Sequence, residues 1–432
     1  MNTLDVVITA WLYLLGVYLF ILVLVQSIIA VLSVLNLFQR EKEKIEFKDD
    51  ARPGIAAVVA AHNEEYTLPM TLNALASQTT PPSQLIIVDD GSTDRTHAAA
   101  RSFISGKGIS NSRVLTTYRG GMGKALQRGL EEVSTPLTCF INADVEIDSH
   151  ALERLHRRFH DPTVVAMSVW VWPLIPKRKG FIASALVLLQ VIEFARAILW
   201  RPGWEKLGAL SIIEGRLGMF RTEVLKGTQT LRTTPSAIDY ALTLEIHRQC
   251  RVKRMPYRIG LETKATVWTD VPLNLRTFFA QRMRYASGFF RAYALNRSMI
   301  GLRKYGALGM FELPARVFTS FFATVEFLLW ATCILLLIAG HSLAAVAWAI
   351  LLTYLVIVTF QLYLSLALSR RFTVYRWPAK FDRLLWLIVP LAAIVWEPVK
   401  GIANLAGWIK MPWRHGPWMP LRHNQPLTTH EL

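Results

Sequence analysis

The dominant pattern along the chain is a series of long apolar runs separated by a stretch of ordinary polarity. The runs cover residues 6–38, 317–339, 343–369 and 384–396. A helix of about 20 apolar residues crosses the hydrocarbon core of a bilayer, because each residue adds about 1.5 Å. The pattern therefore predicts a membrane protein with one long or tilted N-terminal helix in residues 1–40 and several C-terminal helices in residues 311–410.

The flanks of these runs predict the orientation of the chain. The first run is longer than a cleaved signal peptide, and its leading residues, MNTLD, carry an acid in place of a basic segment. Basic residues follow the first run at Arg40 and Lys42, and the third run at Arg370 and Arg371. The positive-inside rule places both flanks in the cytosol. We therefore expect a multi-pass protein whose central polar segment is cytosolic.

Two apolar segments carry charges that argue against a simple crossing. Residues 181–200 place Glu193 and Arg196 in mid-segment, where each charge costs a few kcal/mol in lipid. This segment is expected to lie at the interface or to line an acceptor site. Residues 275–300 mix aromatic residues with arginines, which fits a helix at headgroup level within an interfacial region at 271–310. An amphipathic helix packed on the soluble domain is the alternative.

The last apolar run leaves two arrangements open. Its continuation to residue 408 contains Pro390, Glu397 and Lys400, and such interruptions need a bend or polar neighbours. The run therefore predicts either a bent crossing or a re-entrant pair of helices. Residues 411–432 are expected to form a tail.

Charge and cysteine content exclude some classes of function. The net charge of +17 comes from dispersed basic residues without a recognition motif, so we expect no nucleic-acid partner. An anionic donor or anionic lipid headgroups explain the surplus better. Cys139, Cys250 and Cys333 lack metal-ligand spacing and are expected to be buried, reduced thiols.

The central segment, residues 50–270, alternates short apolar runs with stretches of helical spacing. Strands are predicted at IAAVVAA (55–61), QLIIVDD (84–90), RVLTTY (113–118) and LTCFINAD (137–144), and helices at 66–78, 94–103 and 124–132. This alternation predicts βαβ units in an α/β domain. Its sheet is expected to be largely parallel and covered on both faces.

Polar side chains follow two of these predicted strands. Asp89 and Asp90 end one strand, and Asn142 and Asp144 follow another. Ligands collect at the carboxyl ends of such strands, and oxygen ligands there suit a divalent cation and a diphosphate. Each motif alone also fits turn chemistry, since Asp before Gly-Ser favours a turn and Asp94 fits a helix N-cap.

The segment GGMGKA at 120–125 invites comparison with a phosphate loop. A Walker A motif needs Gly at the place of Tyr118 and Ser or Thr at the place of Ala125, so an NTPase is excluded. The glycines and Lys124 at a predicted helix start can still meet an anion.

Seven motifs in a fixed order carry a resemblance to a known family. They are AAHNEE, VDDGSTD, GMGKAL, NADVEID, EGRLGMFR, AIDYALT and QRMRY, between residues 60 and 285. The chain resembles membrane-embedded, polymer-forming family 2 glycosyltransferases. Bacterial poly-N-acetylglucosamine synthases are the nearest likeness, and chitin-oligosaccharide, hyaluronan and cellulose synthases are wider relatives. The resemblance implies a GT-A-type, Rossmann-like cytosolic domain between N-terminal and C-terminal membrane helices.

The resemblance also assigns roles to the matching residues. It implies Asp239 as the general base and Asp144 as the acid that binds Mg²⁺ or Mn²⁺. It implies donor-binding roles for Glu64, Asp90, Lys124, Asn142, Asp144, Gln281, Arg282 and Arg284. Tyr285 and Trp268 are implied as acceptor-binding residues, although an aromatic residue at 268 taken alone is more often packing. Inverting transfer needs a base on one side of the anomeric carbon and charge stabilisation of the departing diphosphate on the other.

The implied function is processive transfer from a UDP-sugar, with N-acetylglucosamine as the preferred guess, to a growing polysaccharide that is exported across the bacterial inner membrane. A small membrane subunit is a candidate partner. Three departures keep alternatives open: Asn142 replaces an acid of the DxD motif, Ile238 replaces the acid before the base, and Tyr285 replaces the tryptophan of QxxRW. The alternatives are transfer of one sugar to a lipid-linked acceptor and a catalytically inactive membrane partner.

Overall fold

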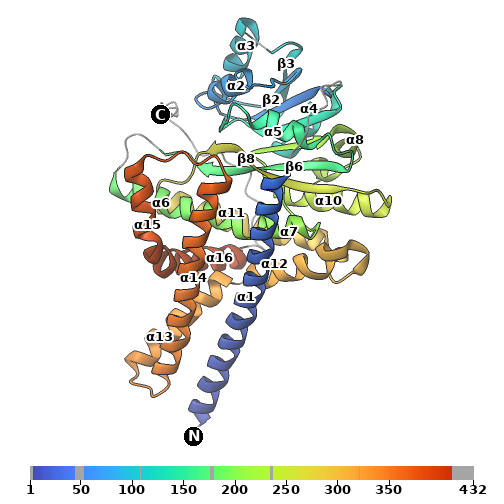
Figure 1. The fold of residues 1–432 in the computed structure, drawn as a ribbon. Helices are drawn as coiled ribbons and strands as arrows, with labels where there is room; N and C mark the ends of the chain where they lie inside the picture. The colour runs from blue at the N-terminus through green and yellow to red at the C-terminus, as the bar shows by residue number, and fades with distance from the viewer. Residues whose placement is uncertain are drawn as a thin grey trace.

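The computed structural model describes residues 3–43, 53–107, 109–175, 180–233, 237–320 and 322–410. It has three levels (Figure 1): a sheet with its covering helices at the top, a layer of helices lying across beneath it, and long helices that extend away from both. The predicted tail at 411–432 lies outside the described residues.

The strands of the sheet are β1 (Ile55–Ala61), β2 (Gln84–Asp90), β3 (Ser112–Thr117), β4 (Leu137–Asn142), β5 (Val145–Ile147), β6 (Val164–Pro173), β7 (Leu217–Arg221) and β8 (Arg258–Thr269). The helices of the same domain are α2 (Leu68–Ala76), α3 (Thr96–Lys107), α4 (Met122–Glu131), α5 (Ala151–Arg158), α8 (Thr222–Lys226), α9 (Thr230–Thr233) and α10 (Ile238–Val252). The predicted strands and helices of residues 55–142 are thus confirmed, with ends shifted by a few residues.

The sheet has the order β3-β2-β1-β4-β7-β6-β8-β5. Its first four strands are parallel, as the βαβ pattern predicts. In the other half β6 and β8 are parallel too, and they run in the same direction as β4. The exceptions to the expected parallel arrangement are β7, which is antiparallel to both β4 and β6, and β5, which is antiparallel to β8. Since β7 joins the two halves, the carboxyl ends of β1, β2, β4, β6 and β8 meet at one edge.

Both faces of the sheet are covered, which explains the nearly continuous apolar strands. Ala56 and Val58 of β1 face one hydrophobic cluster, and Ala57 and Val59 face the other. The three cysteines are free and buried, as predicted.

The N-terminal run forms one helix, α1 (Thr3–Lys42), as predicted. Its upper part packs on α7 (Arg201–Lys206), where the Ser33 hydroxyl accepts a hydrogen bond from the Gly203 amide at 2.7 Å. Close to the end of α1, Arg371 donates to Glu41 at 3.0 Å. The two basic flanks that were predicted to face the cytosol therefore lie side by side.

The C-terminal helices are α12 (Leu313–Ser320), α13 (Phe322–Ile338), α14 (Ala344–Phe372), α15 (Ala379–Leu391) and α16 (Glu397–Lys410). Within the described residues, five stretches are long and apolar enough to cross a membrane: Thr3–Lys42, Phe181–Lys206, Leu308–Ile338, Ala344–Phe372 and Ala379–Ile409. In Figure 1, α13 and α14 extend beside the lower part of α1, whereas α15 and α16 stay near the level of α6 and α11, beneath the sheet. A π-helical turn, Ala392–Trp396, bends the chain between α15 and α16.

The layer beneath the sheet includes α6 (Phe181–Arg196) and α11 (Leu275–Leu295). The two charges inside the apolar segment 181–200 have partners: Glu193 accepts from Arg282 at 2.6 Å, and Arg196 donates to Glu397 at 3.0 Å. These pairs join α6 to α11 and α16, so both charges are neutralised inside protein. The interfacial position of 181–200 stays a prediction.

Candidate functional site

The acids at the end of β2 shape the loops around the sheet edge. The carboxylate of Asp90 accepts hydrogen bonds from the backbone amides of Gly120 at 2.7 Å and Gly121 at 2.8 Å. Asp89 accepts from the Ser92 amide at 2.9 Å. Gly121 has φ +86, a left-handed conformation that favours glycine, immediately before α4. Asp90 therefore fixes the start of α4, and its donor-binding role stays a prediction.

Lys124 lies in the first turn of α4, and its side chain leans back over the same loop. A Cβ atom added to Gly120 would lie 3.0 Å from Lys124 Cδ, so the lysine stem covers this glycine. The neighbouring Gly123 packs under the carbonyl of Leu231 and against Ile238, next to Asp239. The loop held by Asp90 thus lies close to the start of α10.

A second group of acids surrounds the end of β4. Glu64 lies near Asp144, Asp94 and Asp270, and its hydroxyl partner is Thr67. Burial, followed by the Asp144 charge, raises the pKa of Glu64 to about 8. The side-chain oxygen of Asn142 is buried and has no hydrogen-bond partner. Such uncompensated oxygens fit a divalent cation.

The ligand set for that cation is incomplete in the protein alone. Among the described residues, no group of three or more His, Cys, Asp and Glu side chains is placed to hold a metal ion. Asp144, with Asn142 beside it, would hold the cation, which would draw its remaining ligands from a diphosphate and water.

Arg216, just before β7, connects the acidic group to two other elements. Its guanidinium donates to Glu214 at 3.1 Å and to the Tyr285 hydroxyl at 3.3 Å. The charges of Glu214 and Asp144, with Tyr285, hold its pKa above the ordinary range despite burial. The motif EGRLGMFR contains Arg216, but sequence reasoning assigned it no role. The position of the Arg216 side chain depends on the folding together of β7, the end of β4 and α11, which sequence spacing does not reveal.

Asp239 lies in the first turn of α10, close to Glu214. Ala237, two residues earlier, has φ +52, and the Asp239 carboxylate accepts from the Tyr240 amide at 2.9 Å. A Cβ atom on Gly215 would lie 3.6 Å from Asp239 Cβ, which is ordinary van der Waals contact, so Gly215 lies directly beside this carboxylate. Burial and the Glu214 charge raise the pKa of Asp239, while Arg216 and Arg201 oppose the shift. A buried carboxylate with a raised pKa suits proton abstraction.

The motif QRMRY (281–285) lies in the middle of α11 and ends at Tyr285. The Tyr285 ring lies 5.7 Å from Arg282 Cζ and 5.8 Å from Arg284 Cζ, and its hydroxyl meets Arg216. Three guanidinium groups thus gather around one half-exposed ring. Arg282 also pairs with Glu193, and Gln281 is partly buried beside it.

Trp268, near the end of β8, is 3% exposed, and Arg376 covers its ring at 4.9 Å. Arg376 comes from the segment after α14 and also donates to Asp148 at 2.5 Å. An acceptor would reach Trp268 only after Arg376 moved, so its acceptor role stays a prediction. The C-terminal helices thereby contact the sheet edge that carries the site.

A cavity of about 480 Å³ lies between α1, α6, α7, α11, α12 and α16. Its charged lining residues are Glu193, Arg196, Arg201, Arg282, Glu312, Arg316, Glu397 and Lys400, and its aromatic ones are Trp200, Trp204, Phe289, Phe290 and Trp408. Arg201 in this wall pairs with Glu214, which also pairs with Arg216. The cavity therefore adjoins the group formed by Arg216 and Asp239.

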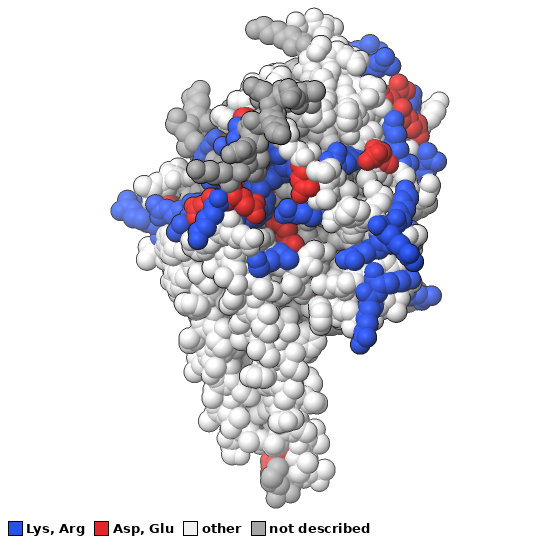
Figure 2. Space-filling view, turned by 45° about the vertical axis from the view of Figure 1, so that its right-hand side comes forward, with Lys and Arg blue, Asp and Glu red and all other residues white. Residues whose placement is uncertain are grey.

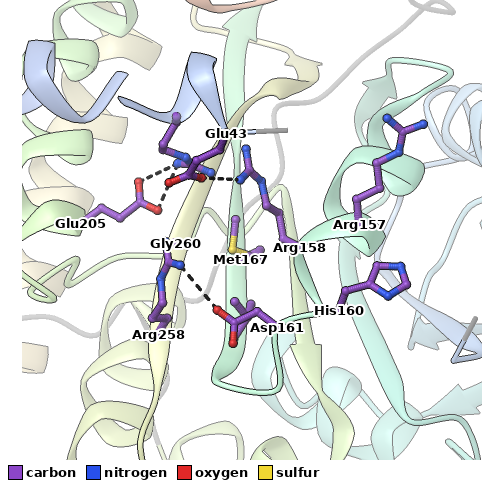
Figure 3. A pocket seen from close by; sticks show the side chains of 11 residues that line it. Glu43, Arg157, Arg158, His160, Asp161, Met167, Glu205, Arg258 and Gly260 are labelled. Atoms are coloured by element: carbon purple, nitrogen blue, oxygen red, sulfur yellow. Dashed lines mark hydrogen bonds and ion pairs between the residues drawn. The ribbon is translucent and has the colours of Figure 1, made fainter. Parts of the chain in front are cut away.

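A second pocket, of about 160 Å³, lies at the opposite ends of β6 and β8 (Figure 3). Its basic side chains have carboxylate partners: Arg40 pairs with Glu205 at 2.8 Å, Arg158 with Glu43 at 3.5 Å, and Arg258 with Asp161 at 3.5 Å. The ion pairs around this pocket hold the end of α1 against the sheet domain.

Comparison with known proteins finds a family match for part of the chain. The model of the family described as glycosyl transferase family 2 matches residues 56–195. A solved mannosyltransferase from Pyrobaculum calidifontis, in complex with GDP-Man and Mn²⁺, has the same fold: its TM-score is 0.56 at 18% identity, with 92% of this chain and 99% of that chain covered. Residues 56–195 are therefore similar to the glycosyl transferase family 2 model, the sheet has a GT-A-like fold, and candidate membrane helices flank it.

Curated relatives narrow the likeness. The poly-beta-1,6-N-acetyl-D-glucosamine synthase of Staphylococcus epidermidis is 28% identical over 237 residues, 54% of each chain. The protein of the same name from Staphylococcus aureus strain COL is 26% identical over 265 residues, 59% of this chain and 60% of that one. The chain thus matches little more than half the length of these relatives.

Proposed function

We propose that the chain is an inverting glycosyltransferase that moves N-acetylglucosamine from a UDP donor to the growing end of a polysaccharide. The names of the curated relatives support the sugar and the polymer. The observation that carries the chemistry is the position of Asp239, beside Arg216 at the sheet edge and next to a cavity between candidate membrane helices.

In the proposed reaction, the Asp239 carboxylate takes the proton of an acceptor hydroxyl. The hydroxyl oxygen forms a bond to the anomeric carbon while the bond from that carbon to the diphosphate oxygen breaks, and UDP leaves. Attack opposite the leaving group inverts the configuration. Arg216 and Arg284 stabilise the negative charge that develops on the diphosphate.

A divalent cation, when bound, neutralises part of the diphosphate charge. Asp144 would hold the cation, with the side-chain carbonyl of Asn142 nearby. Glu64, when protonated, would repel the negatively charged diphosphate less than an ionised carboxylate would. The mannosyltransferase neighbour contains Mn²⁺, which supports a divalent cation of the Mg²⁺ or Mn²⁺ kind.

The cavity supports an acceptor path toward the membrane. Its aromatic and charged lining suits sugar rings, which present apolar faces and hydroxyl edges, and it adjoins Asp239 through Arg201 and Glu214. We propose that the product leaves the cytosol by this route across the bacterial inner membrane. Transfer of a single sugar to a lipid-linked acceptor is the second candidate, because Tyr285 replaces a tryptophan.

The test is a donor screen with the full chain purified in nanodiscs. With Mn²⁺ or Mg²⁺, UDP-N-acetylglucosamine is expected to release UDP and to yield chains of many units, measured by a coupled nucleotide assay and product mass spectrometry. UDP-glucose and GDP-mannose serve as comparison donors. Single additions with every donor would contradict processive synthesis, and no release with any donor would contradict catalysis.

A further inference from the structure

A basic surface lies away from the candidate site, on two neighbouring segments. It consists of residues 248–255 at the end of α10 and residues 295–304 after α11. Its exposed basic residues are Arg248, Arg251, Lys253, Arg254, Arg297, Arg303 and Lys304. The sequence has no acidic residue from 246 to 261 or from 295 to 311. Arg248 pairs with Glu245 at 3.6 Å, and the surface as a whole carries an excess of positive charge.

The two segments form one continuous surface. A Cβ atom on Gly306 would lie 2.8 Å from Arg251 Nη2, so the end of α10 touches the loop that follows α11. Beneath them, Tyr240 of α10 and Met299, Tyr305 and Leu308 of the loop share one hydrophobic cluster. The basic side chains are thus held on a packed base.

Apolar side chains are exposed beside these charges. Leu295 is 64% exposed, Leu302 42% and Phe311 62%, and Val252 on the other segment is 72% exposed. Exposed apolar residues among basic ones are typical of surfaces that rest in the headgroup region of a bilayer. If the surface faced only water, these apolar side chains would be in contact with solvent.

The height of this surface along α1 matches a bilayer boundary. Ile29 of α1 belongs to the same cluster as Met299 and Leu308. From Thr3 to Ile29 the helix rises about 40 Å, enough for a hydrocarbon core of about 30 Å and part of a headgroup layer. The candidate span Leu308–Ile338 begins directly after the loop. In Figure 2, the blue side chains on the right border a lower column that shows few charged residues.

We propose that this basic surface binds the headgroups of anionic phospholipids in the bilayer that holds the chain. Lysine and arginine near an anionic leaflet are each attracted to it, and neighbouring apolar side chains anchor the same surface. The charges are spread over two segments instead of converging on one pocket, so several headgroups are bound together. The binding does not depend on the sugar donor.

The test measures lipid selectivity in nanodiscs with the full chain. Spin-labelled phosphatidylglycerol is expected to associate with the wild-type protein about threefold more strongly than spin-labelled phosphatidylcholine, measured as the immobilised spectral fraction. The preference is expected to vanish in about 1 M NaCl, because the Debye length falls to about 3 Å and exposed charges no longer attract one another over longer distances. The triple variant Lys253→Gln, Arg297→Gln, Arg303→Gln is expected to lose it at ordinary salt.

A control variant with the same loss of charge, Arg101→Gln, Arg113→Gln, Arg128→Gln, lies on the sheet domain and is expected to keep the preference. If wild type shows no preference, or both triple variants lose it equally, the proposal is overturned. It is also overturned if the first triple variant keeps the preference for phosphatidylglycerol at ordinary salt. Should the first variant fail to fold, Arg303→Gln alone and the salt titration of wild type decide the matter. UDP release is recorded separately, so failure of the proposed catalysis does not alter this readout.

Discussion

At the scale of single residues, the surroundings of Asp239 shift the pKa of its carboxyl group in two opposite directions. Burial and the neighbouring Glu214 raise the pKa of its carboxyl group, whereas Arg216 and Arg201 stabilise the charged form. A base needs a pKa high enough to accept a proton and low enough to be ionised at the working pH. The two arginines therefore adjust the basicity of Asp239.

Replacement of Asp239 by Asn removes the base without changing the size of the side chain. We expect kcat to fall by about 100-fold or more, because general base catalysis contributes factors of about 10²–10⁴. Donor affinity, measured by calorimetry with UDP and Mn²⁺, is expected to stay within about threefold. Asp161→Asn, on the far pocket, is the matched control and is expected to keep wild-type turnover. Full turnover in Asp239→Asn would place the base elsewhere.

Replacement of Arg216 by Gln tests whether this residue tunes Asp239. The ionised base is needed, so kcat/KM rises with pH through the raised pKa of Asp239. Loss of the Arg216 charge raises that pKa further, and the acid limb of the pH profile is expected to move to higher pH. We also expect kcat/KM at the plateau to fall about tenfold or more, from the lost charge-assisted bonds to the donor.

Two conservative variants separate charge from geometry at this position. Arg216→Lys keeps the positive charge and should leave the acid limb near its wild-type position while weakening donor binding. Tyr285→Phe removes the hydroxyl that Arg216 meets and should not move the limb. A pH profile that is the same in wild type and Arg216→Gln would show that Arg216 does not act on Asp239.

The residues of the site differ in how far the sequence could predict them. The acids at the ends of β2 and β4 could be predicted because they follow apolar strands, and the proposed general base, Asp239, is assigned through the resemblance of its motif. The contacts of Asp90 with Gly120 and Gly121 depend on a crossing between loops 30 residues apart, and those of Arg216 depend on β7, α10 and α11 together. The spacing of residues along the sequence does not predict such contacts between distant segments.

At the scale of elements, the attachment of α1 to the layer beneath the sheet depends on small residues. A Cβ atom on Gly203 of α7 would lie 2.4 Å from the Ile29 carbonyl oxygen and 2.8 Å from Ser33 Oγ. Because the first of these atoms belongs to the backbone of α1, the helix itself would have to move. The close approach therefore needs glycine at this position.

Gly203→Ala is expected to destabilise this attachment by about 2 kcal/mol, within the range for overpacking in a tight core. The measurement is thermal unfolding of the full chain in detergent, where the midpoint should fall by a few degrees. Gly180→Ala is the control, since a Cβ atom there has nothing within 4 Å. Equal midpoints for both variants would contradict the close contact between α1 and α7.

The same scale explains which elements the sequence predicts. The strands β1 to β4 are bounded by turn residues and separated by helical spacing, so the βαβ pattern fixes their direction. β7 is only five residues long, Leu217–Arg221, and enters the sheet between β4 and β6 in the opposite direction. Strand direction there is decided by long-range packing, which hydrophobic alternation does not encode.

At the scale of the whole molecule, the sheet edge, the cavity and the candidate membrane helices follow one another without a gap. Arg216 and Asp239 lie at the sheet edge, and Arg201 of α7 joins them to the cavity wall. Helices α1, α6, α11, α12 and α16 line the remainder of the cavity. If the cavity carries the growing polymer, then narrowing it should shorten the product without preventing the first transfers.

Ala315 of α12 lines this cavity and offers a direct test. Ala315→Phe adds a ring to the proposed path, so chain length by mass spectrometry is expected to fall several-fold while the initial rate of UDP release stays within about twofold. Ala349→Phe places the same ring at an exposed position of α14 and should leave chain length unchanged. Chains of wild-type length from Ala315→Phe would mean that the polymer leaves by another route. The chemistry at Asp239 would then be separate from the helices beside it.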